Sequence, residues 1–331
     1  MEKPFVSIII PCRNEEKHIG KCLDSIIAND YLKDGLEVLV IDGLSEDGTK
    51  KIIEDYSRRF PFIRLLSNPN KFTPFGLNIG IKNAKGEIII RMDAHAIYDK
   101  DYISKCVEYL KKTGADCVGG TLQTLPSQDT FEAEVIALVL SHSFGVGGRT
   151  FRTKRKEGYV DTVPFGAYRK EIFDKIGLFN EKLVRNQDIE LNSRIRKAGG
   201  KIFITPEIKL SYFAPTTFKG LISQQFQNGL WNIYTQKIAP GSLRARHFIP
   251  LFFVAGLLGS LILTPFTSLS MNLFILILGS YILLDLFFSF KISLKRGIKY
   301  LAVLPIVFFL HHFSYGLGSI FGILTFRRIL K

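Results

Sequence analysis

Short continuous apolar runs alternate with segments of helical spacing over the first 93 residues of the chain. Each run is rich in Ile, Val and Leu, as expected of a strand that is buried on both faces of a parallel sheet. The predicted strands lie at 5–11, 36–42, 62–68 and 86–93, and the predicted helices lie at 14–29, with Asn14 as the expected N-cap, 45–60 and 74–84. This alternation predicts an α/β domain with a parallel, doubly wound sheet.

Polar clusters follow three of these strands: "PCRNEE", "IDGLSEDGT" and "RMDAH". A lone Asp after a strand is usually a turn former or a helix cap. Here the three strand ends together carry Arg13, Glu15, Asp42, Asp93 and His95. Because ligands of open α/β sheets bind beyond the carboxyl ends of the strands, this convergence predicts a ligand site at that edge.

Two long apolar runs, at about 248–267 and 271–290, follow the α/β region. Each is close to the roughly 20 residues that a helix needs to span a bilayer. Basic residues, among them Arg244, Arg246, Lys295 and Lys299, stand before the first run and after the second. The positive-inside rule therefore predicts a membrane hairpin whose flanks, and the preceding domain, are in the cytosol. A buried helical hairpin is the alternative.

A third apolar segment, at about 300–326, has two interpretations. As a single span it would place Arg327, Arg328 and Lys331 outside, against the positive-inside rule. A re-entrant or in-plane pair of helices would keep these cations inside. We therefore expect a domain at 1–240 and a C-terminal membrane region at 241–331, with the form of the third segment open.

The net charge of +14 over 331 residues suits a partner that carries phosphates: a nucleotide, an anionic membrane surface or a nucleic acid. A solvated lysine-rich surface is the alternative. A nucleic-acid binder would explain the charge but neither the spans nor the acidic strand ends. The absence of G-x-x-x-x-G-K-[ST] excludes a P-loop NTPase. The four cysteines form no C-x-x-C pair, which indicates reduced, partly buried thiols in a cytosolic domain.

Four motifs resemble, in order and spacing, the GT-A glycosyltransferases of family 2: "VSIIIPCRNEEKHIGKCLDSI", "VLVIDGLSEDGT", "GLNIGIKNAKGEIIIRMDAHA" and "NQDIELNSRIRKAGGKI". The resemblance covers about 6–231. "FGVGG", "FGAYRKEIF" and "HFSYGLGSIFG" look like the succinoglycan-type group, membrane-anchored transferases that extend a lipid-linked sugar in exopolysaccharide synthesis. The resemblance implies a GT-A domain, Rossmann-like with a mostly parallel sheet, followed by an α-helical membrane region.

The resemblance implies that Pro11, Arg13, Glu15, Asp42 and Asp93 bind the nucleotide-sugar. Asp93 and His95 stand at the Asp-x-Asp position of the family and would hold a divalent cation against the diphosphate. His95 in place of the second Asp is a departure, and imidazole in the ligand set favours Mn²⁺ over Mg²⁺. His95 as a turn residue is the alternative.

Asp188 stands where the family has its catalytic base, and Gln187 replaces the more usual Glu before it. A role for Asp188 as a helix N-cap is compatible with catalysis. The acceptor-binding residues implied by the resemblance are Phe165, Gly166, Ala167, Gln227 and Trp231. Leu230 replaces the arginine of the Q-x-x-R-W motif of processive synthases, so processive polymerisation is disfavoured. Trp231 would stack on the acceptor sugar or anchor the membrane interface.

The expected activity is inverting transfer from a UDP- or GDP-sugar to a polyprenyl-diphosphate-linked saccharide in surface polysaccharide biosynthesis. The enzyme would be an integral protein of the cytoplasmic membrane, with its catalytic domain in the cytosol and no nucleic-acid partner. Two alternatives stay open. One is transfer to polyprenyl phosphate itself, as in dolichol-phosphate mannose synthases. The other is a non-catalytic membrane assembly factor that has kept the fold.

Overall fold

The computed structural model describes residues 3–147, 150–153 and 156–329. The chain forms two compact units, which are described separately. The sheet unit comprises Met1–Gln123 and Thr150–Tyr212, and the helical unit comprises Thr124–Arg149 and Phe213–Lys331. The predicted boundary at residue 240 divides the chain differently, because the segment from 213 to 240 belongs with the C-terminal helices.

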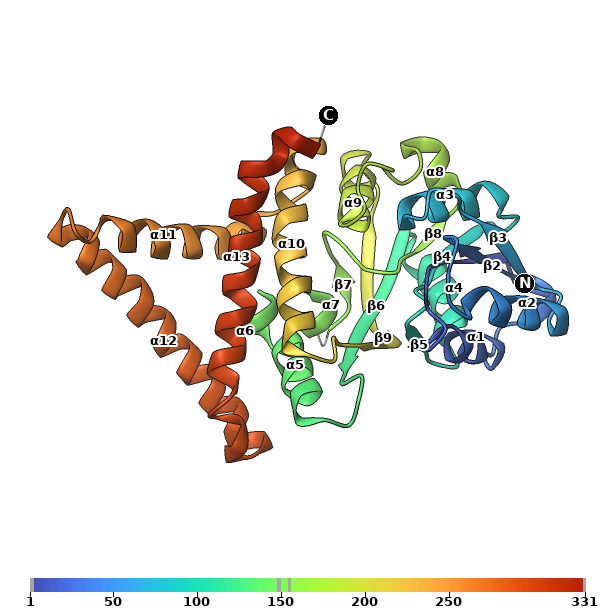
Figure 1. The fold of residues 1–331 in the computed structure, drawn as a ribbon. Coiled ribbons are helices and arrows are strands. Elements are labelled where there is room, and N and C mark those ends of the chain that lie inside the picture. The colour runs from blue at the N-terminus through green and yellow to red at the C-terminus, as the bar shows by residue number, and fades with distance from the viewer. Residues whose placement is uncertain (1–2, 148–149, 154–155, 330–331) are drawn as a thin grey trace. The chain divides into compact units, whose positions relative to one another are not determined.

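One nine-stranded sheet organises the sheet unit, with the order β3-β2-β1-β4-β8-β6-β9-β5 and with β7 paired to β9 (Figure 1). Its strands are β1 (Val6–Cys12), β2 (Leu36–Asp42), β3 (Ile63–Ser67), β4 (Ile88–Arg91), β5 (Ala96–Tyr98), β6 (Cys117–Leu125), β7 (Gly158–Tyr159), β8 (Ala167–Arg169) and β9 (Ile202–Phe213). The first four strands pair in parallel, as predicted. Beyond β4 the pairing becomes antiparallel, because β8 runs against both β4 and β6. The sheet is therefore mixed, where the sequence predicted a mostly parallel one.

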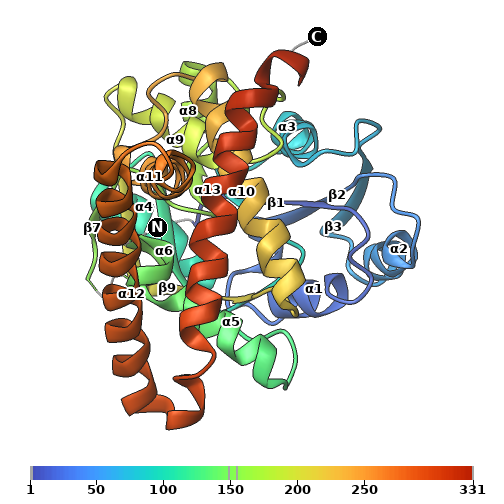
Figure 2. The same ribbon diagram turned by 60° about the vertical axis from the view of Figure 1, so that its left-hand side comes forward.

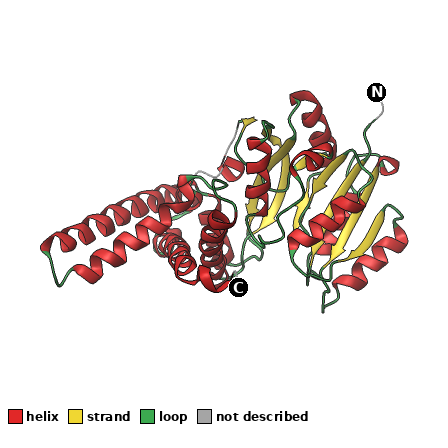
Figure 3. Ribbon diagram, turned by 90° about the horizontal axis from the view of Figure 1, so that it is seen from above, coloured by secondary structure: helices red, strands yellow, loops and turns green. Residues whose placement is uncertain are grey.

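Helices cover both faces of this sheet (Figure 3). They are α1 (Ile19–Ile27), α2 (Thr49–Arg59), α3 (Thr73–Asn83), α4 (Tyr102–Thr113), α7 (Thr150–Thr153), α8 (Glu171–Ile176) and α9 (Gln187–Lys197). Successive residues of β1 point to opposite faces, so Ile8 packs in one core with Leu23 of α1, and Ile9 packs in the other with Leu77 of α3. The expected Asn14 cap is wrong: α1 begins at Ile19 after His18, and the Asn14 side chain instead accepts a 2.9 Å hydrogen bond from the Glu46 N–H.

The helical unit contains α5 (Phe131–Ser141), α6 (Ser143–Val146), α10 (Phe218–Ile238), α11 (Ile249–Leu263), α12 (Ser268–Arg296) and α13 (Leu304–Ile329). In the described part of the chain, three segments are long and apolar enough to cross a membrane: Ala245–Leu263, Ser268–Arg296 and Leu304–Phe326. Large apolar side chains on the first two are exposed, such as Phe252 at 71% and Leu283 at 72%. Apolar exposure on this scale fits a lipid environment rather than water, as the two predicted spans require.

The third apolar segment is one uninterrupted helix, α13, so the re-entrant pair of helices is wrong. It lies along α10, as Figures 1 and 2 both show. Glycines allow this close approach: a Cβ at Gly229 of α10 would fall on the Tyr315 carbonyl oxygen, and one at Gly318 of α13 would fall on that of Phe226. Small residues at a helix crossing are the usual way for backbones to pack this closely.

Two histidines of α13 hold α6 by hydrogen bonds. The His311 Nε2 lies 2.7 Å from the Gly145 carbonyl oxygen, and the His312 Nε2 lies 3.0 Å from that of Phe144. Because a carbonyl can only accept, both Nε2 atoms must carry hydrogen. In neutral His312 the Nδ1 atom then accepts from the Tyr281 hydroxyl of α12, 3.0 Å away. These contacts join the "FGVGG" and "HFSYGLGSIFG" motifs.

Candidate active site

Strained backbone gathers at the loops that meet the predicted ligand edge. Among the described residues, five other than glycine have positive φ angles: Asn14, Leu44, Lys71, Phe165 and Asn186. The first three lie in the loops after β1, β2 and β3, and the other two lie just before β8 and α9. Residues other than glycine adopt this conformation at a free-energy cost, and such strain is concentrated at functional sites. The edge therefore has the backbone signature of a site as well as the polar residues.

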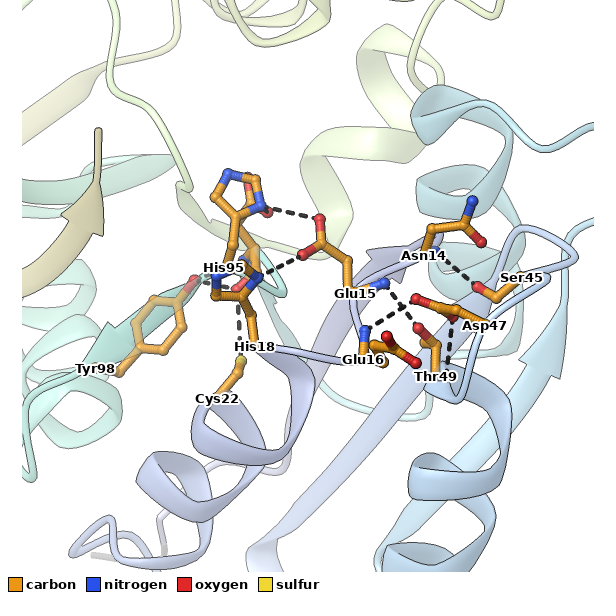
Figure 4. Close-up of polar contacts among 11 residues, drawn as sticks. Asn14, Glu15, Glu16, His18, Cys22, Ser45, Asp47, Thr49, His95 and Tyr98 are labelled. Carbon is orange, nitrogen blue, oxygen red and sulfur yellow. Dashed lines mark hydrogen bonds and ion pairs between the residues drawn. The ribbon is translucent and has the colours of Figure 1, made fainter. Parts of the chain in front are cut away.

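The loops after β1 and β2 are tied together by hydrogen bonds (Figure 4). The Asn14 N–H donates to the Ser45 Oγ at 2.9 Å, and the Glu15 N–H donates to the Thr49 Oγ1 at 2.7 Å. The Asp42 carboxylate, only 5% exposed, accepts the Ser45 hydroxyl at 2.5 Å. Its two oxygens also accept the Ser45 N–H, at 3.3 and 3.2 Å. Asp42 thus shapes the loop, and its remaining lone pairs can accept a ligand N–H.

The structure brings four of the predicted nucleotide-sugar residues to this edge. Pro11 lies near the end of β1 and is half-buried. Asp42 ends β2 and pairs in the sheet with Cys12, the neighbour of Pro11. Arg13 and Glu15 follow on the loop, where the exposed Arg13 lies 3.4 Å from Glu46. Their common location is therefore observed, while their contacts with a nucleotide stay a prediction.

His95 connects two carboxylates of the site. It lies in the turn between β4 and β5, and its Nδ1 is 3.0 Å from the Asp93 Oδ1 and 3.2 Å from the Glu15 Oε1 (Figure 4). Its ring centre is 5.3 Å from that of Tyr212. The Tyr98 hydroxyl fixes the Asp93 backbone by accepting its N–H at 2.5 Å. His95 is thus a turn residue by position, but its side chain is part of the acidic cluster.

The charge of Asp93 raises the pKa of His95 to about 9, a hydrogen bond to Glu15 acts in the same direction, and burial opposes both. The ring is therefore an imidazolium at neutral pH when nothing else neutralises the two carboxylates. The ion pairs with Asp93 and Glu15 keep the proton on Nδ1.

Asp93 and His95 fit the role of a partial metal site. Within the described ranges, no group of three or more His, Cys, Asp or Glu side chains is arranged to hold a metal ion. The 3.0 Å between the Asp93 Oδ1 and the His95 Nδ1 nevertheless suits two adjacent ligands, which are about 3 Å apart when each bond is about 2.1 Å. A cation bound by both residues would replace the imidazolium proton and would need its remaining ligands from a substrate or water.

Asp188 is the second residue of α9, and its carboxylate forms an ion pair with the Arg91 Nη1. Sequence reasoning assigned no role to Arg91. The signal was present, since an arginine at the end of an apolar strand, directly before "MDAH", cannot be buried there without an anionic partner. Arg91 is 6% exposed, burial lowers the pKa of its guanidinium, and the charge of Asp93 opposes that shift.

Arg91 makes two further contacts. Its guanidinium lies over the ring of Phe165, 5.4 Å from the ring centre, and its backbone N–H donates to the Gly166 carbonyl at 3.1 Å. Within the described part of the chain, the buried Nε atom has no hydrogen-bond acceptor. A buried donor without a partner costs roughly 1–3 kcal/mol, so this arrangement lowers the stability of the fold.

The predicted acceptor-binding residues fall into two groups. In the sheet unit, a Cβ at Gly166 would lie 2.7 Å from the Cys117 sulfur, so only glycine fits there. Ala167 is fully buried within β8, so any effect of its side chain on an acceptor would be indirect. Gln227 and Trp231 lie on α10 of the helical unit, and Trp231 packs edge-to-face on Tyr234 at 5.5 Å. Acceptor contacts by all five residues remain a prediction.

These groups supply the parts for a substitution reaction on a phosphorylated substrate. The Asp93–His95 pair offers ligands for a cation that would bind phosphate oxygens. Asp188 offers a carboxylate that can accept a proton. Asp188 is carried by the first turn of α9, and the Asp93–His95 pair lies in the short turn between β4 and β5.

Comparison with known proteins identifies relatives over nearly the whole chain. The family described as Glycosyl transferase family 2 matches residues 7–177. The chain is 31% identical to the dolichyl N-acetyl-α-D-glucosaminyl phosphate 3-β-D-2,3-diacetamido-2,3-dideoxy-β-D-glucuronosyltransferase of Methanococcus voltae, over 98% of this chain and 99% of that protein. It is 29% identical to the succinoglycan biosynthesis protein ExoA of Rhizobium meliloti (strain 1021), over 74% of each chain.

Solved structures show the same fold. The mannosyltransferase PcManGT of Pyrobaculum calidifontis, in complex with GDP-Man and Mn²⁺, superimposes with a TM-score of 0.64 at 16% identity, over 97% of this chain and 88% of that one. TarS 1–349 of S. aureus, in complex with UDP, gives 0.54 at 15% identity, over 98% of this chain and 91% of that one. At this identity the likeness bears on the fold alone, and it confirms the expected GT-A architecture.

Proposed function

Because the chain belongs to glycosyltransferase family 2 and is a glycosyltransferase, we propose that it transfers a sugar from a nucleotide-sugar to a lipid-linked saccharide, with inversion at the anomeric carbon. The observation that carries this proposal is the meeting of the Asp93–His95 pair and the Asp188 carboxylate at one edge of the sheet unit, linked through Arg91. Inversion needs a donor clamp and a single base, and these residues offer both.

The donor half of the site would consist of the loops after β1 and β2 and the Asp93–His95 pair. Pro11, Arg13, Glu15 and Asp42 would line the nucleoside and diphosphate region of a UDP- or GDP-sugar. Asp93 and His95 would hold a divalent cation, which neutralises negative charge on the departing diphosphate. Mn²⁺ suits a mixed oxygen and nitrogen pair better than Mg²⁺ does.

Asp188 would act as the general base. It accepts the proton of the acceptor hydroxyl while the hydroxyl oxygen attacks the anomeric carbon from the face opposite the nucleotide. The new C–O bond forms as the bond to the phosphate oxygen breaks, and the bonding pair leaves with the nucleoside diphosphate. One displacement of this kind inverts the anomeric centre.

The proposed acceptor is a polyprenyl-diphosphate-linked saccharide at the cytosolic face of the cytoplasmic membrane. Two observations support it. The Methanococcus voltae relative is named for a dolichyl-phosphate-linked sugar, and the described residues of this chain include three helices long enough to cross a membrane. Phe165, Gly166, Gln227 and Trp231 are the proposed acceptor contacts. Transfer to polyprenyl phosphate itself is the competing activity.

The test is Asp188→Asn in the full-length protein in membranes. Each UDP- and GDP-sugar is supplied in turn, with a polyprenyl-diphosphate saccharide or a polyprenyl phosphate as acceptor. We expect a loss of transfer of about 10²–10⁴-fold with donor binding retained, because asparagine keeps the shape of the carboxylate but accepts no proton. Asp101→Asn, at the start of α4, is the matched control and should keep full activity. More than about a tenth of wild-type activity in Asp188→Asn would exclude it as a general base.

A further inference from the structure

Arg91 lies between the two acidic groups to which the proposed reaction gives different tasks. It ends β4, two residues before Asp93 on the same segment. Its guanidinium forms the ion pair with Asp188, which is 97 residues further along the chain. One side chain therefore connects the end of β4 with the first turn of α9.

The backbone that carries Arg91 is fixed on both sides. β4 pairs in parallel with β1, where Arg91 lies opposite Ile9, and antiparallel with β8. The Arg91 N–H also donates to Gly166 at 3.1 Å, and the Phe165 ring lies under the guanidinium. The position of the Arg91 guanidinium is thus set by the sheet and not by a mobile loop.

Stability alone does not account for this arrangement. A buried ion pair is often no more stable than apolar residues of the same volume, because both charges must leave water. Here the guanidinium also buries an Nε donor that finds no acceptor among the residues the structure describes. A buried pair with an unsatisfied donor, at the centre of a site with strained loops, points to a role in chemistry.

We propose that Arg91 is a positioning residue, whose guanidinium holds the Asp188 carboxylate at a fixed place relative to Asp93. This inference rests on the proposed function, in which Asp188 is the base and Asp93 belongs to the donor clamp. The sugar to be transferred must lie between those two groups. A fixed separation then sets the base on the acceptor face of the anomeric carbon while the diphosphate is held on the other face.

This role predicts a specific kinetic change. Misplacing a catalytic group by about 1 Å costs on the order of 10²-fold in rate. Loss of Arg91 should therefore lower kcat, whereas binding of the donor, which uses the loops after β1 and β2, should be nearly unchanged. A purely structural role would instead lower thermal stability and the yield of donor-binding protein without separating kcat from donor affinity.

The experiment compares Arg91→Met, Arg91→Lys and Asp188→Asn with the wild type as full-length protein. Arg64→Met is the matched control, because Arg64 lies on β3 of the same sheet, 3.4 Å from Glu37 and outside the site. For each protein we would measure kcat for transfer, KM and direct binding of the nucleotide-sugar with Mn²⁺, and thermal stability. Arg91→Met should lose about 10²-fold in kcat with donor affinity within about threefold. Arg91→Lys should recover part of the loss, since it keeps the charge but not the planar fork.

The outcomes separate this inference from the function on which it rests. If Asp188→Asn is inactive while Arg91→Met keeps at least half of the wild-type kcat, the positioning role is wrong and the proposed base stands. If Asp188→Asn is active, the base assignment and this inference both fall. If Arg91→Met does not bind the donor, Arg91→Gln, which keeps N–H donors without the charge, is judged by the same criterion. Equal losses of kcat and donor binding in every folded Arg91 variant would also overturn the proposal.

Discussion

In the sheet unit, buried charge is gathered into ion pairs such as Arg91 with Asp188, whereas in the helical unit buried polar groups mostly bond to backbone carbonyls. There, the Ser319 hydroxyl donates to the Gly229 carbonyl at 3.2 Å, and His311 binds that of Gly145 at 2.7 Å. The first kind of contact is costly and leaves charge available for chemistry. The second satisfies backbone acceptors while letting helices pack closely.

The surfaces of the two units also differ, in how many large apolar side chains they expose. In the sheet unit large apolar side chains are mostly buried, and exposed ones such as Leu32 and Tyr159 are scattered. On α11 and α12 the exposed residues are predominantly Leu, Ile and Phe. Each unit therefore matches a different solvent, and perturbations of one should leave the other intact. The following tests use that separation.

Removal of divalent cations should have the largest effect, and only on the sheet unit. Excess EDTA should lower transfer by at least about 10²-fold without unfolding the protein, because the diphosphate would then leave without charge neutralisation. A lower concentration of Mn²⁺ than of Mg²⁺ should be enough to restore activity. His95→Asp should shift that preference toward Mg²⁺, since it restores an all-oxygen pair.

The readout is nucleotide release against metal concentration. Asp99→Asn, near the site but outside the pair, is the control. Full activity in excess EDTA, or an unchanged preference in His95→Asp, would leave His95 as a turn residue without a metal role.

Gly318→Ala should damage only the helical unit. Its Cβ would meet the backbone of Phe226, which cannot move without separating α10 from α13. Overpacking of this kind costs roughly 1–3 kcal/mol or more. Gly279→Ala on α12 is the matched control, because nothing lies within 4 Å of its Cβ position. Thermal unfolding in detergent should show a clear loss of stability for Gly318→Ala alone, and equal values for the two variants would contradict the observed crossing.

Raising the pH should lower the stability of the metal-free sheet unit, by less than Gly318→Ala lowers that of the helical unit. The pKa of His95 is raised from 6.5 to about 9 by Asp93 and Glu15, so its ion pairs stabilise the fold fully below pH 6.5. That contribution is lost as the pH rises through 9. Since about a third of the ring is exposed, we expect a loss of about 1–2 kcal/mol. Apparent Tm in EDTA between pH 6.5 and 9.5 should fall more for wild type than for His95→Gln, and parallel curves would refute the assignment.

The smallest effect is expected with thiol reagents. Cys12, Cys22, Cys106 and Cys117 are all buried, and burial raises the pKa of each thiol, so little thiolate is present at pH 8. Native protein should react with an aromatic disulfide reagent far more slowly than protein unfolded in guanidinium chloride. Rapid modification of any one thiol in the native protein would show that the sheet unit opens locally.

Much of the sheet unit could be predicted from sequence because its strands are short apolar runs whose ends are marked by polar clusters. The four parallel strands and the edge that carries Asp42, Asp93 and His95 followed from that pattern. The antiparallel half did not, since β8 has only three residues and gives no periodicity of its own. Tertiary pairing with β4 and β6 decides its direction.

The ion pair between Arg91 and Asp188 also lay beyond local pattern, because it joins positions 97 residues apart. The position of α10 could not be predicted from local pattern either. Its sequence mixes polar and apolar residues. Its packing beside α13 depends on glycines such as Gly229, whose role can be recognised only when the facing backbone is known. The Asn14 cap failed for a different reason: its side chain bonds to the neighbouring loop, a tertiary partner that competes with the helix end.

Because the segments of the two units alternate along the chain, some contacts of the helical unit can form only late in synthesis. Gly145 and its partner His311 are 166 residues apart, so at about 5–20 residues per second the ribosome needs about 10–30 s to supply that contact. Throughout this interval α5, with Val135, Ile136 and Val139, lacks the α13 residues that complete its core. The sheet unit meanwhile receives its last strands. Assembly of the helical unit is thus completed only after α13 has been synthesised, and slow translation before residue 304 lengthens the exposure of an apolar helix to chaperones and proteases.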